Sequence, residues 1–148
     1  MMELIVPEET VVVRYGDGDD IIAQAQQIWI ILVSSVMGAK FRGEKEFKIT
    51  YGDLAELMGY RDRRAGHMLG RQLGIVGMYC KTHNIAPLNA IVVTQESDEP
   101  GCGVLLREGR SVRKEQASVM KEDWFSVRVP SIEVLQDMWG LIKEQIRD

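Results

Sequence analysis

The segment ITYGDLAELMGYRDRRAGHMLGRQL, residues 49–73, restricts the fold of this chain more than any other part of the sequence. Thr50 can cap a first helix, because Asp53 follows it at the three-residue spacing of a capping box. Gly59 can end that helix, since glycine readily adopts the left-handed conformation found at helix ends. The apolar side chains expected on the buried side are Leu54, Ala55, Leu57 and Met58. A second helix follows, so the segment predicts a helix-turn-helix.

The second helix, expected from Arg61 or Asp62 to Leu73, is rich in arginine although the protein is acidic overall. Its expected apolar stripe consists of Ala65, Met68, Leu69 and Leu73. The chain has 148 residues and a net charge of −4 at pH 7. A basic helix on an acidic protein requires a local partner, and nucleic acid is the first candidate. The overall acidity excludes a general nucleic-acid coat protein, so contact with nucleic acid is expected on one face only.

The residues before this segment predict a short β element and a long core helix. Residues 2–15 carry two short apolar runs separated by Pro7, which is typical of strands at a sheet edge. Either of two neighbouring aspartates can cap a helix over residues 21–36, where apolar side chains recur at helical spacing. Residues 38–48 are charged and contain glycines near both ends, so a loop is expected there.

The residues after it predict two strands. Residues 74–77 can end or kink the second helix, and a further short helix is expected from Met78. Residues 88–94 predict a buried strand, and residues 103–106 predict its partner. Two strands after a helix-turn-helix form the hairpin, or wing, of a winged helix.

The predicted fold class is therefore α+β: a winged helix-turn-helix core with a short N-terminal β element and a C-terminal helical extension. The core is expected over residues 1–110 and the extension over residues 111–148. Trp124 and Phe125 are candidates for docking the extension onto the core, and Ser131 can cap the last helix. The apolar side chains expected on that helix are Ile132, Leu135, Met138, Trp139 and Ile142.

Four stretches of the chain occur in an order that one known family shows. They are Gln26-Gln27-Ile28-Trp29 with Leu32, Thr50-Tyr51-Gly52-Asp53-Leu54-Ala55, Leu69-Gly70-Arg71-Gln72-Leu73, and Pro87 followed by Ile91-Val92-Val93. Over about residues 23–103 the chain thereby resembles the DNA-binding domain of alkylguanine-DNA alkyltransferases and of their catalytically inactive alkyltransferase-like relatives. The Thr-Tyr-Gly-Asp-Leu-Ala stretch is the most specific of the matches.

The resemblance implies DNA binding without alkyl transfer. Where the family has its nucleophilic cysteine this chain has Leu88, and where the activating histidine follows it has Asn89. A leucine cannot accept an alkyl group, so no nucleophilic chemistry is expected there. The family's intercalating arginine falls near His67 or Met68, so base flipping is not expected either.

The expected nucleic-acid contacts lie in and beside the arginine-rich helix. Tyr51 matches the family tyrosine that contacts the DNA backbone, and arginine forks and helix N-termini both suit phosphate. The expected set is Tyr51, Arg61, Arg63, Arg64, His67 and Arg71, and the cations that could extend it are Lys40, Arg42, Lys45 and Lys48. In the alternative interpretation the arginines form a solvated surface together with Asp62 and Glu56.

The other chemistry-bearing residues predict neither a catalytic site nor a cofactor. Cys80 and His83 have the spacing of half a zinc site, and His67 with Cys102 would complete four ligands. A buried Cys80 thiol and a surface His83 imidazole are the favoured interpretation. No glycine-rich phosphate loop follows a strand.

A second class of function is a protein-binding regulator of the immunity, anti-defence or adaptor type, without nucleic-acid contact. Trp124 and Phe125 would then be interface anchors. The carboxylates Glu96, Asp98 and Glu99 lie in the expected wing and would repel DNA, which favours this class.

A cytoplasmic location with reduced thiols and no membrane contact is expected. The N-terminus lacks the basic start and the cleavage site of a signal peptide. The apolar run at residues 30–33 is too short for a membrane span, and the chain has only two cysteines.

Overall fold

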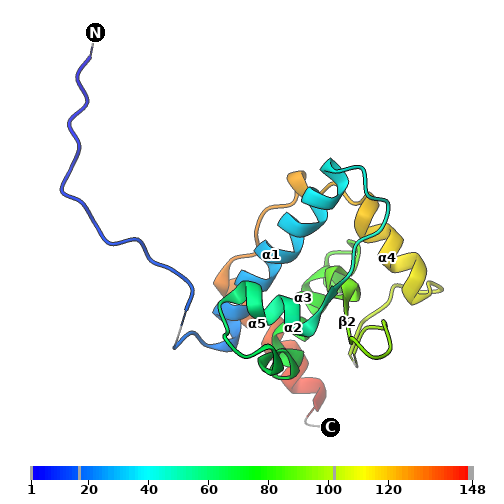
Figure 1. Ribbon diagram of the computed structural model, residues 1–148. Coiled ribbons are helices and arrows are strands. Elements are labelled where there is room, and N and C mark those ends of the chain that lie inside the picture. Colours follow the sequence, from blue (N-terminus) through cyan, green and yellow to red (C-terminus); the bar gives the residue numbers. More distant parts are fainter. Residues whose placement is uncertain (1, 17, 102, 147–148) are drawn as a thin grey trace.

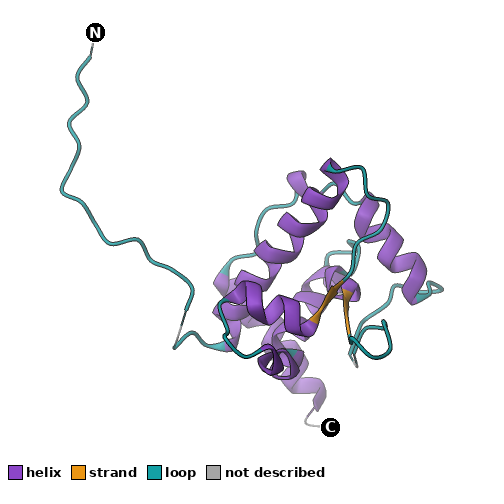
Figure 2. Cartoon of the chain, in the orientation of Figure 1, coloured by secondary structure: helices purple, strands orange, loops and turns teal. Residues whose placement is uncertain are grey.

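The computed structural model describes residues 2–16, 18–101 and 103–146 (Figure 1). The elements are, in order, α1 (Ile21–Phe41), β1 (Ile49–Thr50), α2 (Tyr51–Met58), the 3-10 helix η1 (Arg63–Met68), α3 (Gly70–Thr82), the 3-10 helix η2 (Leu88–Ile91), β2 (Val92–Val93), α4 (Val112–Lys121), the 3-10 helix η3 (Trp124–Ser126) and α5 (Ile132–Ile146). Helices dominate and surround one short pair of strands (Figure 2). The chain is thus an α+β protein in the broad sense.

Helix α1 is the centre of the fold, and α2, α3, α4 and α5 all contact it. Its N-terminus is capped by Asp20, whose carboxylate accepts hydrogen bonds from the backbone N–H of Ile22 at 3.1 Å and of Ala23 at 2.9 Å. Its buried side chains are Ile22, Ala25, Ile28, Trp29, Leu32, Val36 and Ala39. The helix continues to Phe41, because the buried Ala39 extends its apolar face, so the loop expected from residue 38 begins later.

The length of α1 bears on the membrane expectation. With its mean hydropathy of 1.5, the helix is long and apolar enough to cross a membrane by length and composition alone. The sequence pattern had suggested that the apolar run at residues 30–33 is too short for a membrane span. The whole helix has 21 residues, so length alone does not exclude a span. Core helices have the same composition, and residues on several sides of α1 are buried against its neighbours.

Helix α2 has the two ends that the sequence predicts. The Thr50 hydroxyl accepts a hydrogen bond from the Asp53 N–H at 3.1 Å, and Gly59 takes the left-handed conformation with φ of 105°. Leu54, Ala55 and Met58 are buried as expected. Leu57 is exposed, because it lies on the other side of this short helix.

The C-terminal extension packs on the core through Trp124. Its indole N–H donates a hydrogen bond to the Val119 carbonyl at 2.7 Å, and its ring meets Trp29 edge-on, with 5.7 Å between ring centroids. Phe125 is 83% exposed. Trp124 is therefore the docking residue, and Phe125 is not. On α5, Leu135 and Met138 are buried, whereas Ile132 lies at the surface.

The strand pairing corrects the expected hairpin. β1 and β2 pair in parallel, with Ile49 opposite Val92 and Thr50 opposite Val93. Parallel strands need a long crossover connection, and α2, η1, α3 and η2 supply it. Most of the strand expected at residues 88–94 is the 3-10 helix η2.

The expected second strand of the wing, residues 103–106, is not a strand. After β2 the chain turns back and makes a single antiparallel bridge, between Val93 and Pro100. Proline has no backbone N–H, so it cannot extend a ladder of hydrogen bonds. The loop at residues 94–101 therefore replaces the expected hairpin.

The expected N-terminal β element is also wrong. Residues 2–14 are extended and exposed, and they project from the body of the molecule (Figure 1). Apolar β-branched residues form a strand only where a partner edge is available. In the described ranges no strand pairs with this segment.

Helix α3 runs through Gly74 and Gly77 without a break, so the separate helix expected from Met78 belongs to it. Gly77 is needed for close packing, since a Cβ at this position would lie 2.5 Å from the Asn89 Nδ2 atom on η2. Gly77 therefore allows α3 to approach η2, and neither glycine ends the helix.

Candidate functional site

The expected arginine-rich helix is divided into a turn, η1 and the start of α3. Asp62 caps η1, because its carboxylate accepts a hydrogen bond from the Arg64 N–H at 2.9 Å. Gly66 lies so close to α2 that a Cβ there would be 2.5 Å from the Tyr51 carbonyl oxygen. Met68, expected to be buried, is 73% exposed. The expected contacts of this region thus lie on a turn, on η1 and on the first turn of α3, and not along one helix.

These elements border a pocket of about 420 Å³. The start of α2, η1, the first residue of α3 and the loop at residues 94–101 surround it. Of the expected contacts, Tyr51, Arg63, Arg64 and His67 line this pocket. Arg61 and Arg71 are not part of its lining.

Tyr51 is held in place by the loop that forms the opposite wall. Its hydroxyl oxygen accepts a hydrogen bond from the Gly101 N–H at 2.9 Å. The side chain is half-buried, and its hydroxyl proton is still available for an acceptor such as a phosphate oxygen. This contact depends on glycine, since a Cβ at residue 101 would overlap the tyrosine hydroxyl.

Two of the arginines are paired with carboxylates. Arg63 contacts Asp53 at 2.5 Å and Glu56 at 2.8 Å through the same nitrogen, and Arg64 contacts Asp62 at 2.7 Å. The bond to Asp53 is the main reason why the pKa of Arg63 is raised, and the bond to Asp62 raises the pKa of Arg64. These contacts engage only Nη1 of Arg63 and only Nε and Nη2 of Arg64, so a phosphate would meet guanidinium groups whose charge the carboxylates already offset in part.

The remaining cations of the expected set are free of such partners. Arg61 lies in the turn before η1, His67 lies in η1 and Arg71 lies in the first turn of α3, all three exposed. Within the described ranges none of them is in an ion pair. They are the side chains best placed to meet an anion.

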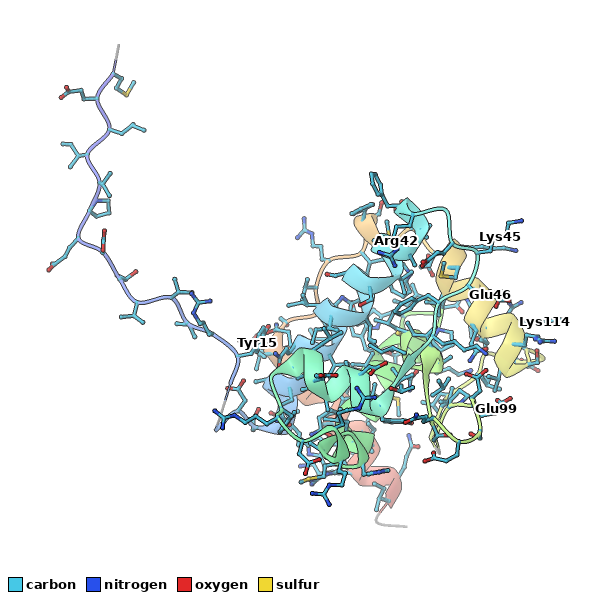
Figure 3. All side chains as sticks on the ribbon, viewed as in Figure 1. Tyr15, Arg42, Lys45, Glu46, Glu99 and Lys114 are labelled. Carbon is cyan, nitrogen blue, oxygen red and sulfur yellow. The ribbon has the colours of Figure 1, made fainter. Side chains whose placement is uncertain are left out.

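The loop before β1 does not extend this cationic surface. Figure 3 shows Arg42 and Lys45 toward the C-terminal end of α1. Arg42 is paired with Glu44 at 3.1 Å. Lys48 is paired with Asp98 at 3.0 Å, which neutralises one carboxylate of the acidic loop.

The position that matches the family's nucleophile is buried. Leu88 and Asn89 lie in η2 beneath the surface, and neither lines the pocket. Burial is the main reason why the pKa of the Cys80 thiol is raised to about 12, so this thiol stays protonated near neutral pH.

The residues considered for zinc do not come together in the parts of the chain that the structure describes. No group of three or more His, Cys, Asp or Glu side chains is placed there to hold a metal ion. Cys80 is in the core, and His83 stacks on the Tyr79 ring with 4.0 Å between centroids. Cys102 lies outside the described residues.

Sequence reasoning missed the wall of the pocket that Thr94, Gln95 and Gly101 form. The proline and glycine at residues 100 and 101 signalled a turn, but only the folded chain places this turn beside Tyr51. No family model, curated protein or solved structure matches this chain. The likeness to alkyltransferases therefore rests on the order of the motifs alone.

Proposed function

We propose that this protein binds DNA without catalysing a reaction, through the surface formed by the turn before η1, η1 itself and the first turn of α3. The observation that supports the proposal is the cluster of exposed basic residues on a protein of net charge −4, namely Arg61, Arg64 and Arg71 with His67 among them. In this proposal α2 and α3 are the helices of a helix-turn-helix, and the loop at residues 94–101 takes the place of the wing.

The ion pairs divide the arginines into two groups. Arg61 and Arg71 can meet phosphates with their full charge, whereas the charges of Arg63 and Arg64 are already offset in part by their carboxylates. Phosphate contacts position a protein on DNA without selecting sequence. The proposal therefore assigns the largest contributions to the salt dependence of DNA binding to Arg61 and Arg71. Tyr51 acts as a hydrogen-bond donor to the DNA backbone.

The acidic loop limits how DNA can approach. Glu96 lines the pocket, and Glu99 is exposed beside it. Because these carboxylates repel phosphates, the backbone should pass over η1 and the start of α3 and approach this loop only at Tyr51. A cytoplasmic location belongs to the same proposal.

Fluorescence anisotropy with short labelled duplex and single-stranded DNA, titrated with salt, tests the proposal. Each lost phosphate contact should reduce the slope of log K against log salt by about 1. We expect Arg61→Ala and Arg71→Ala each to produce this reduction, and Arg63→Ala to produce less. Arg128→Ala removes the same charge from an exposed position in the loop before α5 and serves as the control. Absence of binding at low salt, or equal losses in the Arg128 and Arg61 variants, would reject the proposal.

The second candidate is a protein-binding regulator. The exposed Phe41 and Phe125, 94% and 83% accessible, favour it because large exposed aromatic side chains often anchor protein interfaces. In this case DNA should not bind at any salt concentration. Phe125→Ala should then leave folding unchanged and weaken capture of the partner.

A further inference from the structure

The N-terminal arm, residues 2–14, has no partner in the described parts of the molecule. It makes no backbone hydrogen bond there. Ile5, Val11 and Val13 are 95%, 92% and 97% exposed. Exposed runs of apolar β-branched side chains are unusual on a protein that stays alone, and they mark segments that add to another surface. The arm also carries Glu3, Glu8 and Glu9 against a single Arg14, so it is acidic.

A groove with matching properties lies on another part of the surface. The α4 groove, of about 220 Å³, lies between residues 45–48 and one side of α4. Its α4 wall consists of Arg113, Gln116, Ala117 and Met120, which recur at the spacing of a single helix face. Lys45 and Arg113 outnumber Glu46 in its lining, whereas Lys48, which also lines it, is already paired with Asp98. Figure 3 shows Tyr15, at the base of the arm, on the opposite side of the body from Lys45.

The groove also offers a free backbone. Residues 46–48 lie outside helices, turns and bends and lead directly into β1. Their backbone N–H and C=O groups form no hydrogen bond with the backbone of another described residue. Among the described residues β1 pairs with β2 alone, so no strand occupies its other edge. An extended segment can add to such an edge through backbone hydrogen bonds, while its side chains enter the adjacent groove.

We propose that the arm of one protomer docks in the α4 groove of a second copy of this chain, as an added strand beside residues 46–48. Glu8 and Glu9 meet Lys45 and Arg113, and the apolar residues of the arm face the α4 wall. Exchange of both arms around a twofold axis gives a closed dimer in which each groove is filled.

The length of the arm argues for a second copy rather than for the arm's own groove. The Tyr15 hydroxyl donates a hydrogen bond to Gln26 at 2.6 Å, which holds the base of the arm near the start of α1. Lys45, in the wall of the groove, lies on the other side of the body, toward the far end of this helix of 21 residues (Figure 3), which is about 31 Å long. An arm that runs along the whole of α1 needs about nine extended residues for that distance. Glu8, Glu9 and the valines would then lie along the helix and could not enter the groove. Two copies with antiparallel α1 helices place the base of each arm beside the partner's groove.

The test uses the full chain in light scattering and sedimentation over a concentration series. The arm variant is Glu8→Lys with Glu9→Lys, and the groove variant is Lys45→Glu with Arg113→Glu. The wild type should be a dimer, and each variant alone should dissociate at concentrations at least tenfold higher. An equimolar mixture should restore a dimer, because each reversed arm meets a groove of opposite charge and each native arm meets a native groove.

The control variant, Glu133→Lys with Glu144→Lys, makes the same change of charge at exposed positions of α5 and should remain dimeric. Circular dichroism establishes that every variant is folded. A wild type that stays monomeric, an arm variant that stays dimeric, or a mixture of folded variants that does not associate would each overturn the proposal. A monomer whose arm resists proteolysis, with that resistance lost in both variants, would also overturn it and place the arm in its own groove.

Discussion

Replacement of Glu115 by glutamine is expected to lower the free energy of unfolding by about 3 kcal/mol at pH 7. Glu115 lies on α4 and its side chain is fully buried. Its carboxylate accepts hydrogen bonds from the Arg107 backbone N–H at 3.0 Å and from the Arg107 guanidinium at 2.8 Å. A further bond comes from Arg110 at 2.6 Å. Through these bonds Arg107 and Arg110 connect the loop before α4 to Glu115 on the helix.

The magnitude follows from the pKa of the carboxyl group. Burial alone raises the pKa of Glu115, but the hydrogen bonds from Arg107 and Arg110 outweigh it and lower the pKa from 4.5 to about 2. At about 1.4 kcal/mol for each pH unit, this difference corresponds to roughly 3 kcal/mol. Because the folded-state pKa is the lower one, this stability is complete above about pH 5 and is lost as the pH falls toward 2.

Urea denaturation at several pH values between 7 and 3 measures this effect. The wild type should lose stability over the acid range, and Glu115→Gln should be less stable at pH 7 and change less with acid. Glu44→Gln removes the partner of Arg42 from an exposed ion pair and should cost only a few tenths of a kcal/mol. A Glu115 variant within about 0.5 kcal/mol of the wild type at pH 7 would refute the reasoning, because a buried carboxylate with these partners cannot be removed at so little cost.

Three further predictions concern the core. Gly66→Ala should lower the free energy of unfolding by about 2–3 kcal/mol in chemical denaturation, because its Cβ would meet rigid backbone of α2. A Cβ added at Gly70 would have no atom within 4 Å, so Gly70→Ala should leave the free energy of unfolding unchanged or raise it. Equal losses of stability in the Gly66 and Gly70 variants would contradict the prediction. Trp124→Phe should cost about 1–3 kcal/mol in the same assay, since a buried carbonyl loses its donor, whereas Phe125→Ala should change stability by less than about 0.5 kcal/mol. Iodoacetamide at pH 8 should modify Cys80 only after unfolding in urea, because burial raises the pKa of its thiol to about 12; peptide mapping that finds modification in the folded protein would disprove this.

Local features of the fold could be predicted from the sequence. The caps at Asp20 and Thr50 and the end of α2 at Gly59 depend on atoms only a few residues apart, so short patterns identify them. The burial of Trp124 was one of two interpretations, and the contact with Trp29 decides between them. A large aromatic side chain near a break in the helical pattern is compatible with docking on the core and with a protein interface.

Features that depend on distant parts of the chain could not be predicted. The parallel pairing of β1 and β2 requires knowing how the intervening helices fold back. The division of the expected recognition helix follows from the approach of Gly66 to α2, which no local pattern encodes. For the candidate site, the fold brings Arg63 and Arg64 to the pocket that Tyr51 lines and leaves Arg61 and Arg71 outside it. Spacing along the sequence could not decide which of these arginines pair with Asp53, Glu56 and Asp62, because rotamers choose among several partners within reach.

The parallel pairing of β1 with β2 has a consequence for how the molecule opens. β1 precedes α2 and β2 follows η2, so the two strands join the beginning and the end of the whole segment at residues 51–91. Closing so long a loop carries a high entropic cost, and this pairing should therefore form late in folding. In native-state hydrogen exchange the amides of α2 and α3 should accordingly become labelled together, as one cooperative unit, rather than fraying one helix at a time.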